Sequence, residues 1–297
     1  MADERNFRST YYEKVGCRSV EERRSLEILL KDKPLNVLKL KQFCILFNVP
    51  NIYRNLLWNF LLGVTPAYTD SSRYVMAQRE AVYNDLQHAL KVMRTIDDKT
   101  SKAKVLYAMW LLETKQLRLG VDLSDDHPFC DITKVLLKTF TSSVEIYWMA
   151  KGFYDYSQEI NEEMGKLVDL TSTLLEKEDN GLFMHLKSCD ILNVLPLARW
   201  YGSFFAGVLP ELALIRIWDK ICGGSIKIVI FVLIEILRML RRHVFKCMTL
   251  NALLECIKSM EHDQETADLV INKAIELWQQ NKGHNEFIMQ SKIKTLI

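Results

Sequence analysis

The sequence has little proline and glycine, with 6 and 11 of these residues among 297. Most segments between them carry apolar residues at helical spacing, and no segment alternates apolar and polar residues as a half-buried strand does. This pattern excludes a sandwich or barrel built from many short strands joined by turn residues. We therefore expect an all-α fold of about 12 to 14 helices, near the usual length of about 11 residues.

An excess of charge and a long hydrophobic run are also missing. The 39 Lys and Arg residues nearly balance the 37 Asp and Glu residues, which gives a net charge of +2. Proteins that bind nucleic acid are usually more basic, so no nucleic-acid partner is expected. The longest apolar run, residues 228–234, is too short to span a bilayer. It predicts a buried central helix and no transmembrane segment.

Close cysteine pairs and metal-binding spacings are absent too. The seven cysteines show no Cys-x-x-Cys spacing, and the lack of a signal peptide favours a reducing, cytosolic compartment. The six histidines have no metal-ligand spacing, and the sequence has no Gly-rich phosphate loop. We expect neither a metal nor another cofactor.

The segment Leu209–Gly224 carries signals for both ends of a helix. Pro210 suits the first turn, and the glycine pair at the end of the segment suits the stop. Arg216 and Asp219 are three residues apart, so their side chains can meet on the helix surface beside Trp218. The favoured interpretation is an ion pair that anchors the helix. The alternative is a catalytic role for one of the two, which is the minority use of ion pairs.

The string from Trp200 to Asp219 reads Trp-Tyr-x-x-x-Phe-x-x-x-Leu-Pro-x-x-x-x-x-Arg-Ile-Trp-Asp. It resembles the C-terminal signature of TBC domains, an all-helical family whose members mostly activate GTP hydrolysis on Rab-type GTPases. Residues 49–62, Val-Pro-x-x-x-Arg-x-x-x-Trp-x-x-Leu-Leu, are similar to the opening motif of that family. Glu145-x-x-Trp148 is similar to its acidic-aromatic helix, and residues 182–186 to a shorter motif.

The resemblance implies a two-lobed, all-α TBC domain over residues 35–280. A helical extension over residues 1–34 is expected to pack on this domain, and residues 281–297 are expected to form a short C-terminal tail. The motif residues are expected to support the fold rather than a reaction. They are Arg54, Trp58, Trp148, Trp200, Pro210, Arg216, Trp218 and Asp219.

Active TBC domains use an arginine finger in an Ile-x-x-Asp-x-x-Arg motif, whose guanidinium stabilises charge on the transferring phosphoryl group. Aligning this motif on Arg94 puts His88 at the Ile position and Lys91 at the Asp position. Aligning it on Val82 and Asp85 puts His88 in the place of the arginine, where a neutral imidazole is a weak substitute. Arg94 is thus a degenerate finger candidate.

The second finger of the family is a glutamine in a Tyr-x-Gln motif followed by glycine. Residues 107–131, where the motif belongs, contain no Tyr-x-Gln. The match Tyr156-Ser157-Gln158 falls after Glu145-x-x-Trp148, and we interpret it as chance, with Gln158 starting the next helix. The sequence therefore predicts a TBC domain without catalytic residues.

Residues 5–16, 25–32 and 88–92 resemble one branch of the family, a non-catalytic subunit of the tuberous sclerosis complex. That resemblance implies a scaffold that binds the coiled coil of hamartin and, through it, tuberin. Tuberin carries the domain that activates GTP hydrolysis on Rheb and so restrains mTORC1 signalling. The implied location is cytoplasmic, with peripheral association with lysosomal or vesicle membranes. The alternative function is an active GTPase-activating protein for a Rab-family GTPase, using Arg94.

Two surfaces are candidates for contact with partners. An apolar stripe on a helix expected over residues 267–278 consists of Val270, Ile271, Ala274 and Trp278. It could receive a partner helix or simply pack on the body of the protein. A basic helix end consists of Arg238, Arg241, Arg242, His243 and Lys246. The favoured interpretation is a solvent-exposed helix end, where the helix dipole stabilises positive charge. The alternative is that these residues contact acidic lipid or a partner.

Overall fold

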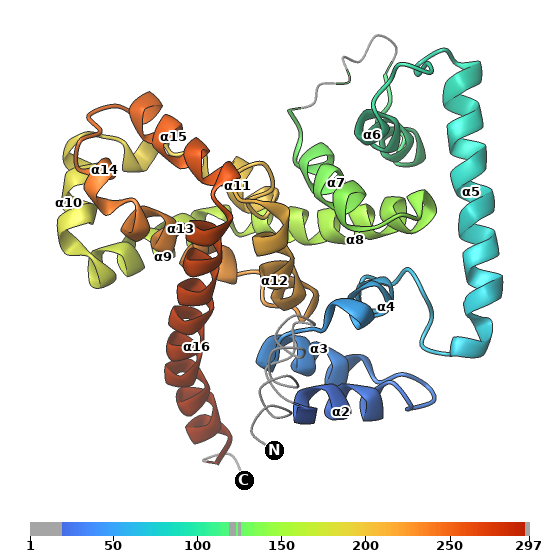
Figure 1. Ribbon diagram of the computed structural model, residues 1–297, viewed down its shortest axis with the longest axis horizontal. Coiled ribbons are helices and arrows are strands. Elements are labelled where there is room, and N and C mark those ends of the chain that lie inside the picture. The colour runs from blue at the N-terminus through green and yellow to red at the C-terminus, as the bar shows by residue number, and fades with distance from the viewer. Residues whose placement is uncertain (1–19, 119–122, 124–125, 295–297) are drawn as a thin grey trace, which may run out of the picture. The chain divides into compact units, whose positions relative to one another are not determined.

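The computed structural model describes residues 20–118, 123 and 126–294, and within them the chain is all-α. The helices are α2 (Val20–Leu29), α3 (Val37–Leu46), α4 (Asn51–Leu61), α5 (Ser72–Val92), α6 (Lys102–Glu113), α7 (Pro128–Thr139), α8 (Ser143–Glu162), α9 (Met164–Glu178), α10 (Asn180–Ser188), α11 (Leu197–Gly202), α12 (Glu211–Cys222), α13 (Ile228–Met239), α14 (Arg241–Val244), α15 (Leu250–Lys258) and α16 (Gln264–Lys294) (Figure 1). Short 3-10 turns occur at Thr69–Ser71, Leu192–Val194 and Ser259–His262. In these ranges no strand forms, and the β-pairing is a single isolated bridge between Ala206 and Leu209.

The described residues divide into two compact units. The first unit contains the chain up to residue 159 together with residues 218–225. The second unit contains residues 160–217 and the chain from residue 226 onward. Helices α8 and α12 therefore contribute residues to both units.

Three large aromatic side chains form the centre of the first unit. Trp58, Phe153 and Trp218 are all fully buried. The ring of Phe153 lies 5.2 Å from that of Trp58 and 4.7 Å from that of Trp218, measured between centroids. These rings come from α4, α8 and α12, so burial of aromatic surface draws together helices that are distant in the sequence. Gly152 permits close approach of α8, because a Cβ there would lie 2.8 Å from the Cβ of Leu62.

The central helix of the second unit is α13, buried from Ile228 to Leu237. This confirms the buried helix predicted from the apolar run, since a helix that is apolar on nearly all sides must be covered by others. α16 packs against α13. No helix in the described part of the chain is both long and apolar enough to cross a membrane.

Two helices end where the apolar periodicity did not predict an end. The apolar periodicity of residues 132–153 predicts one continuous helix, but α7 ends at Thr139 and α8 begins at Ser143. The hydroxyl of Ser142 accepts a 3.4 Å hydrogen bond from the amide of Glu145, which caps α8. α11 ends at Gly202 rather than at residue 208, because Phe204 and Phe205 adopt φ values of 51° and 62°. Burial of both phenyl rings holds this left-handed turn.

Two further differences concern α5 and α16. The buried residues of α5 are Tyr83 and Leu90, whereas Val82, predicted to point inward, is exposed. Leu90, also predicted to face inward, is buried, so the inward face is shifted by only part of the rotation of about 100° that separates Val82 from Tyr83. α16 was expected to end near Trp278 but runs to Lys294. No proline interrupts that stretch, and its residues include several good helix formers.

Candidate functional site

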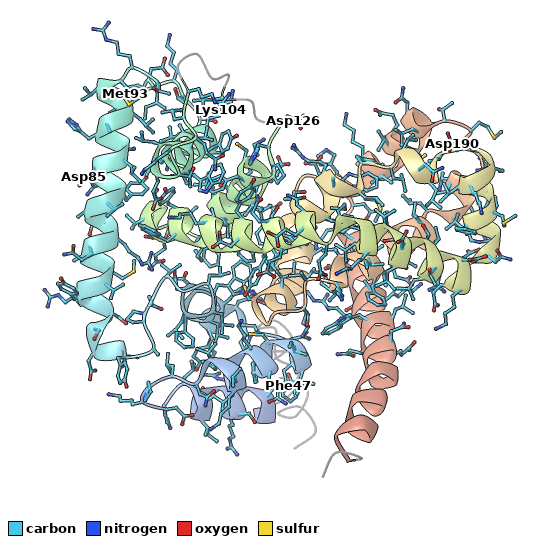
Figure 2. The ribbon with its side chains drawn as sticks, turned by 180° about the vertical axis from the view of Figure 1, so that it is seen from behind. Phe47, Asp85, Met93, Lys104, Asp126 and Asp190 are labelled. Carbon is cyan, nitrogen blue, oxygen red and sulfur yellow. The ribbon has the colours of Figure 1, made fainter. Side chains whose placement is uncertain are left out.

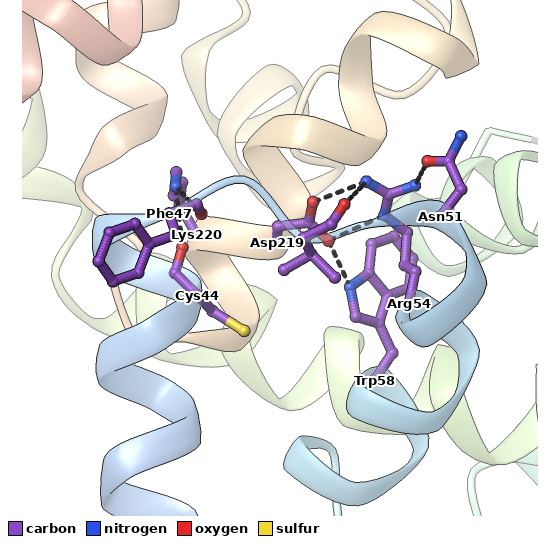
Figure 3. A network of polar contacts seen from close by, with 8 residues as sticks. Cys44, Phe47, Asn51, Arg54, Trp58, Asp219 and Lys220 are labelled. Carbon is purple, nitrogen blue, oxygen red and sulfur yellow. Dashed lines mark hydrogen bonds and ion pairs between the residues drawn. The ribbon is translucent and has the colours of Figure 1, made fainter. Parts of the chain in front are cut away.

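A buried ion pair joins α4 to the end of α12 in the first unit (Figure 3). Arg54 Nε donates to Asp219 Oδ1 at 3.0 Å, and Arg54 Nη2 donates to Asp219 Oδ2 at 2.9 Å. Trp58 Nε1 donates to Asp219 Oδ1 at 2.8 Å. The two charged side chains are only 6% and 2% exposed. This geometry is the bidentate arrangement in which a planar guanidinium matches a carboxylate.

The remaining nitrogens of Arg54 are also bound to the protein. Nη2 donates to the carbonyl of Val49 at 2.8 Å, and Nη1 donates to the side chain of Asn51. Every guanidinium nitrogen therefore has a partner within the fold. The arrangement supports packing of α4 against α12 and leaves no part of Arg54 to act on a substrate.

A second buried cation, Lys220, lies beside this network and was not predicted from the sequence. Lys220 Nζ donates to the carbonyl oxygens of Cys44 at 2.9 Å and Phe47 at 2.7 Å, at the C-terminal end of α3 (Figure 3). The last carbonyls of a helix lack partners within the helix, and an ammonium group satisfies two of them here. The presence of a lysine in an otherwise apolar helix was the feature of the sequence from which this buried cation could have been predicted. Burial raises the pKa of the Cys44 and Cys222 thiols, so neither is poised as a thiolate nucleophile.

Arg216, predicted to pair with Asp219, has partners on α16 in the second unit. Its Nη2 donates to the side chain of Asn272 at 2.5 Å, and its Nη1 lies 3.9 Å from a carboxylate oxygen of Asp268. The partners of Asp219 are Arg54 and Trp58. The three-residue spacing of Arg216 and Asp219 would allow them to meet on one helix. In the structure, each of them instead binds residues that are far away in the sequence.

The acidic-aromatic motif holds α8 to its neighbours in the first unit. The guanidinium carbon of Arg79 lies 4.3 Å from the ring centre of Trp148, and Lys151 Nζ lies 4.4 Å from it. Trp148 Nε1 donates to the carbonyl of Arg79 at 3.3 Å. Glu145 accepts a 3.2 Å hydrogen bond from Asn55. Cations over an aromatic face are stabilising, so these contacts give the motif a structural role.

Trp200 lies on α11, and Pro210 immediately precedes α12. The rings of Trp200 and Phe205 stack with 6.4 Å between centroids. The carbonyl of Pro210 accepts hydrogen bonds from the amides of Ala213 and Leu214, both at 3.1 Å. Pro210 therefore starts α12, as its fixed φ favours. At the other end, Gly224 has φ = 92°, a conformation that requires glycine and ends the helix.

The finger candidate lies just past the end of α5. Arg94 has φ = 56°, and its amide donates to the carbonyl of Lys91 at 3.0 Å. Its side chain is exposed, and none of the ion pairs in the described residues holds it. His88 and Asp85, the alternative alignment, are exposed on α5. Figure 2 shows Asp85 on the outer side of that helix and Met93 at its end. No ion pair with another described residue holds the side chain of Arg94, His88 or Asp85 in place.

A cavity of about 250 Å³ opens beside α5 in the first unit. Its charged lining consists of two lysines, Lys91 and Lys102, and two carboxylates, Asp97 and Asp98. The hydroxyl of Thr100 donates to Asp97, which lowers the pKa of that carboxyl. The two lysines and the two carboxylates balance, so the lining has no excess of positive charge to attract the phosphates of a nucleotide.

The glutamine motif of active TBC domains belongs within residues 107–131 of this chain. Gln116 and Leu117 lie in the expected region, and residues 119–122 and 124–125 of it lie outside the described structure. Gln158 does not start a helix as predicted, because α8 continues to Glu162. It is exposed in that helix and forms a hydrogen bond with Tyr154.

Residues 129–245 match the Rab-GTPase-TBC domain family. The chain is 39% identical over 285 residues to TBC1 domain family member 7 of Homo sapiens, covering 94% of this chain and 96% of that protein. The protein of the same name from Danio rerio is 38% identical over 293 residues, covering 95% and 98%. The chain belongs to the TBC domain family.

Solved TBC domains share the fold. The Ypt/Rab-GAP domain of Gyp1p matches with a TM-score of 0.61 and 14% identity, covering 89% of this chain and 99% of that one. The Chlamydomonas flagellar RabGAP TBC domain matches with a TM-score of 0.56 and 15% identity, covering 86% and 95%. The predicted all-α TBC fold is thereby confirmed.

The apolar stripe that was a candidate for partner binding is internal to this TBC domain. Val270, Ile271, Ala274 and Trp278 are all buried in the second unit. They lie on α16, which packs against α13. A partner helix could reach them only by displacing α16, so the prediction that they form a docking surface is corrected. Periodicity identified the apolar face but not what covers it.

Proposed function

We propose that this TBC domain is a non-catalytic scaffold subunit that binds the coiled coil of hamartin. Through hamartin it would stabilise the complex with tuberin, and so support GTPase activation toward Rheb and restrain mTORC1 signalling. Support comes from 38–39% identity, over almost the whole chain, to proteins named TBC1 domain family member 7. The same proposal implies a cytoplasmic protein with peripheral association with lysosomal or vesicle membranes.

The proposal that this domain is non-catalytic is supported mainly by the residues found at the positions of the arginine-finger motif. Lys91 occupies the position of the family's acidic residue, and His88 that of its isoleucine. A cation cannot orient Arg94 by an ion pair as a carboxylate would, and Arg94 itself is exposed. Catalysis of phosphoryl transfer depends on positioned charge, so an unrestrained arginine contributes little.

The surface we propose for the hamartin helix is on α4, with α3 beside it. Ile52 and Leu56 are one helical turn apart and are 56% and 47% exposed. Leu38 on α3 is 79% exposed, and α3 packs against α4. Apolar residues at i and i+4 are the anchors that a helical partner can cover. This surface replaces the buried stripe on α16 as the candidate.

The domain boundaries are part of the proposal. We assign residues 35–280 to the TBC domain, residues 1–34 to an extension and residues 281–297 to a tail. The extension includes α2, whose Glu27 accepts a 2.8 Å hydrogen bond from the hydroxyl of Tyr53 on α4. This contact supports packing of the extension on the domain.

The second candidate function is activation of a Rab-family GTPase by Arg94. The match of Arg94, followed by Thr95, to the end of the family's finger motif favours it. GTP hydrolysis by a panel of Rab proteins should be measured with the wild-type chain, with Arg94→Ala and with Arg73→Ala, an exposed arginine on α5 that serves as control. We expect no stimulation by any of the three.

An active arginine finger contributes about 10³ to 10⁵ in rate. Strong stimulation that disappears in Arg94→Ala and persists in Arg73→Ala would establish the second function and overturn the non-catalytic proposal.

A further inference from the structure

One corner of the second unit combines exposed apolar and basic side chains. It is formed by α10 and by α14 with the turn that follows it. We call it the α10–α14 patch, and its members are Met184, Lys187, Arg242, Phe245, Lys246 and Met248, all exposed.

Several contacts hold the two elements of this corner together, and they lie side by side in Figure 1. His185 Nε2 lies 3.0 Å from the carbonyl oxygens of both Val244 and Cys247. The rings of His185 and Phe245 are 5.1 Å apart. The sulfurs of Cys189 and Met248 lie 4.0 Å apart. The patch is therefore one surface built from two segments that are about sixty positions apart in the sequence.

The apolar members are unusually accessible for side chains of their size. Met184, Phe245 and Met248 are 55%, 38% and 69% exposed. Scattered exposed apolar residues are normal, but a cluster rimmed by polar residues marks an interaction site. Methionine adapts its shape to what it contacts, which suits a deformable partner.

The charges in this corner are predominantly positive. Lys187, Arg242 and Lys246 form no ion pair with the rest of the described chain. Arg241 is occupied by Asp179 at 2.6 Å. Asp190, which follows α10 and lies at the outer edge of this unit in Figure 2, accepts a 2.9 Å hydrogen bond from Asn193. The three cations Lys187, Arg242 and Lys246, with no ion-pair partner among the described residues, make the surface complementary to an anionic partner.

We propose that the α10–α14 patch binds the surface of a membrane that contains anionic phospholipid. Lys187, Arg242 and Lys246 would lie against lipid phosphates, while Phe245, Met248 and Met184 enter the boundary between headgroups and acyl chains. Long basic side chains can hold their charge in the headgroup layer while their stems cover apolar surface. An acidic helical peptide is less well matched, because such a helix lays its apolar face into a continuous apolar groove, whereas the apolar and basic members of the patch alternate along residues 242–248.

Membrane contact by this surface requires no hamartin. The proposal rests on the peripheral membrane association in the proposed function and names the surface and the lipid for it, and it can fail separately from the binding of hamartin. The proposed hamartin surface is in the first unit, whereas the patch is in the second.

The test is co-sedimentation of the full chain with phosphatidylcholine vesicles, with and without phosphatidylserine. We expect binding only to vesicles that contain phosphatidylserine, and binding that weakens as salt increases. A triple variant, Lys187→Glu, Arg242→Glu and Lys246→Glu, should lose at least about a hundredfold in partition, since each cation near an anionic surface contributes roughly fivefold. Phe245→Ser with Met248→Ser should lose about tenfold, because the apolar insertion is removed.

The matched control is Lys99→Glu with Lys102→Glu and Lys115→Glu, three exposed lysines of the first unit. It changes the net charge equally and should lose much less binding than the patch variant. Equal losses in the two triple variants would overturn the proposal, as would wild-type protein that ignores phosphatidylserine. If the wild type ignores vesicles but binds an acidic helical peptide through the same cations, the patch is a protein interface instead. Retained hamartin binding in the patch variant would show that the scaffold function is independent.

Discussion

Arg54 and Asp219, 165 positions apart in the sequence, form a buried bidentate ion pair in which both Arg54–Asp219 hydrogen bonds are 3.0 Å or shorter. The pair joins the opening TBC motif on α4 to the signature motif on α12. Two sequence motifs of the family thus each supply one residue of the same ion pair. The motifs identify the fold, and the chemistry of the family depends on residues elsewhere.

Replacing Asp219 by alanine should destabilise the fold strongly. The change leaves the Arg54 guanidinium buried without its counter-charge and Trp58 Nε1 without its acceptor. Breaking one partner of a buried pair costs about 3–5 kcal/mol. Urea denaturation measures the free energy of unfolding, and Arg216→Ala is the comparison. Arg216 is 24% exposed, so its loss should cost no more than about 1 kcal/mol. Similar losses in the two variants would contradict the account.

Lys220→Met should loosen the end of α3. Methionine keeps most of the side-chain volume but removes the donor to the carbonyls of Cys44 and Phe47. Leaving buried polar groups without partners costs about 1–3 kcal/mol. Hydrogen exchange should show faster exchange in α3 than in the wild type, with α6 in the same unit changed much less. Unchanged protection in α3 would show that Lys220 is dispensable there.

Gly152→Ala should destabilise the first unit although alanine is the better helix former. A Cβ at this position would lie 2.8 Å from the Cβ and 3.1 Å from the carbonyl oxygen of Leu62, so α4 and α8 would have to separate. Gly165→Ala on α9 is the control, because a Cβ there has no neighbour within 4 Å. That substitution should be neutral or stabilising by up to about 1 kcal/mol. The opposite order of the two melting temperatures would refute the close-approach argument.

Asp179 should contribute a pH-dependent stability. Burial alone would raise the pKa of its carboxyl, but hydrogen bonds from Arg241 and from the amide of Leu182 lower the pKa overall. The ionised carboxylate therefore stabilises the fold above the ordinary carboxyl pKa of about 3.9. That contribution is lost as the pH falls through the lowered pKa of the folded state.

Asp179→Asn isolates this charge effect, because asparagine can still cap α10. Denaturation at neutral and at acid pH should show the variant less stable than the wild type at pH 7, with the difference shrinking in acid. A difference that stays constant across the range would mean that the carboxylate charge has no part in it.

The sequence predicted the helix at α12 well because proline and glycine mark both ends. The break between α7 and α8 was missed because apolar residues continue with helical period across it. Ser142 and Glu145 indicate the N-terminal cap of a new helix, but the continuous apolar periodicity gave no reason to place a helix start there. The left-handed turn at Phe204 and Phe205 could not be predicted, because burial of two rings overrides their backbone preference.

The candidate sites show the same limit. Spacing along one helix proposed Arg216 as the partner of Asp219, whereas the observed partner Arg54 is separated from it by most of the first unit's sequence. Likewise, the apolar stripe of α16 was visible in the sequence, but its cover, α13, was not. Periodicity specifies which face of a helix is apolar, and tertiary packing decides which apolar residues stay exposed.

The central claim is that this TBC domain binds the hamartin coiled coil, and isothermal titration of the purified chain with a hamartin C-terminal coiled-coil fragment tests it most directly. We expect a complex with a dissociation constant below micromolar. Leu56→Asp with Ile52→Asp should weaken binding at least about tenfold, because each change places an unpaired charge in the proposed apolar contact. Leu212→Asp, which alters another exposed leucine, should bind as the wild type does. No detectable binding of the wild-type chain at micromolar concentrations would contradict the account.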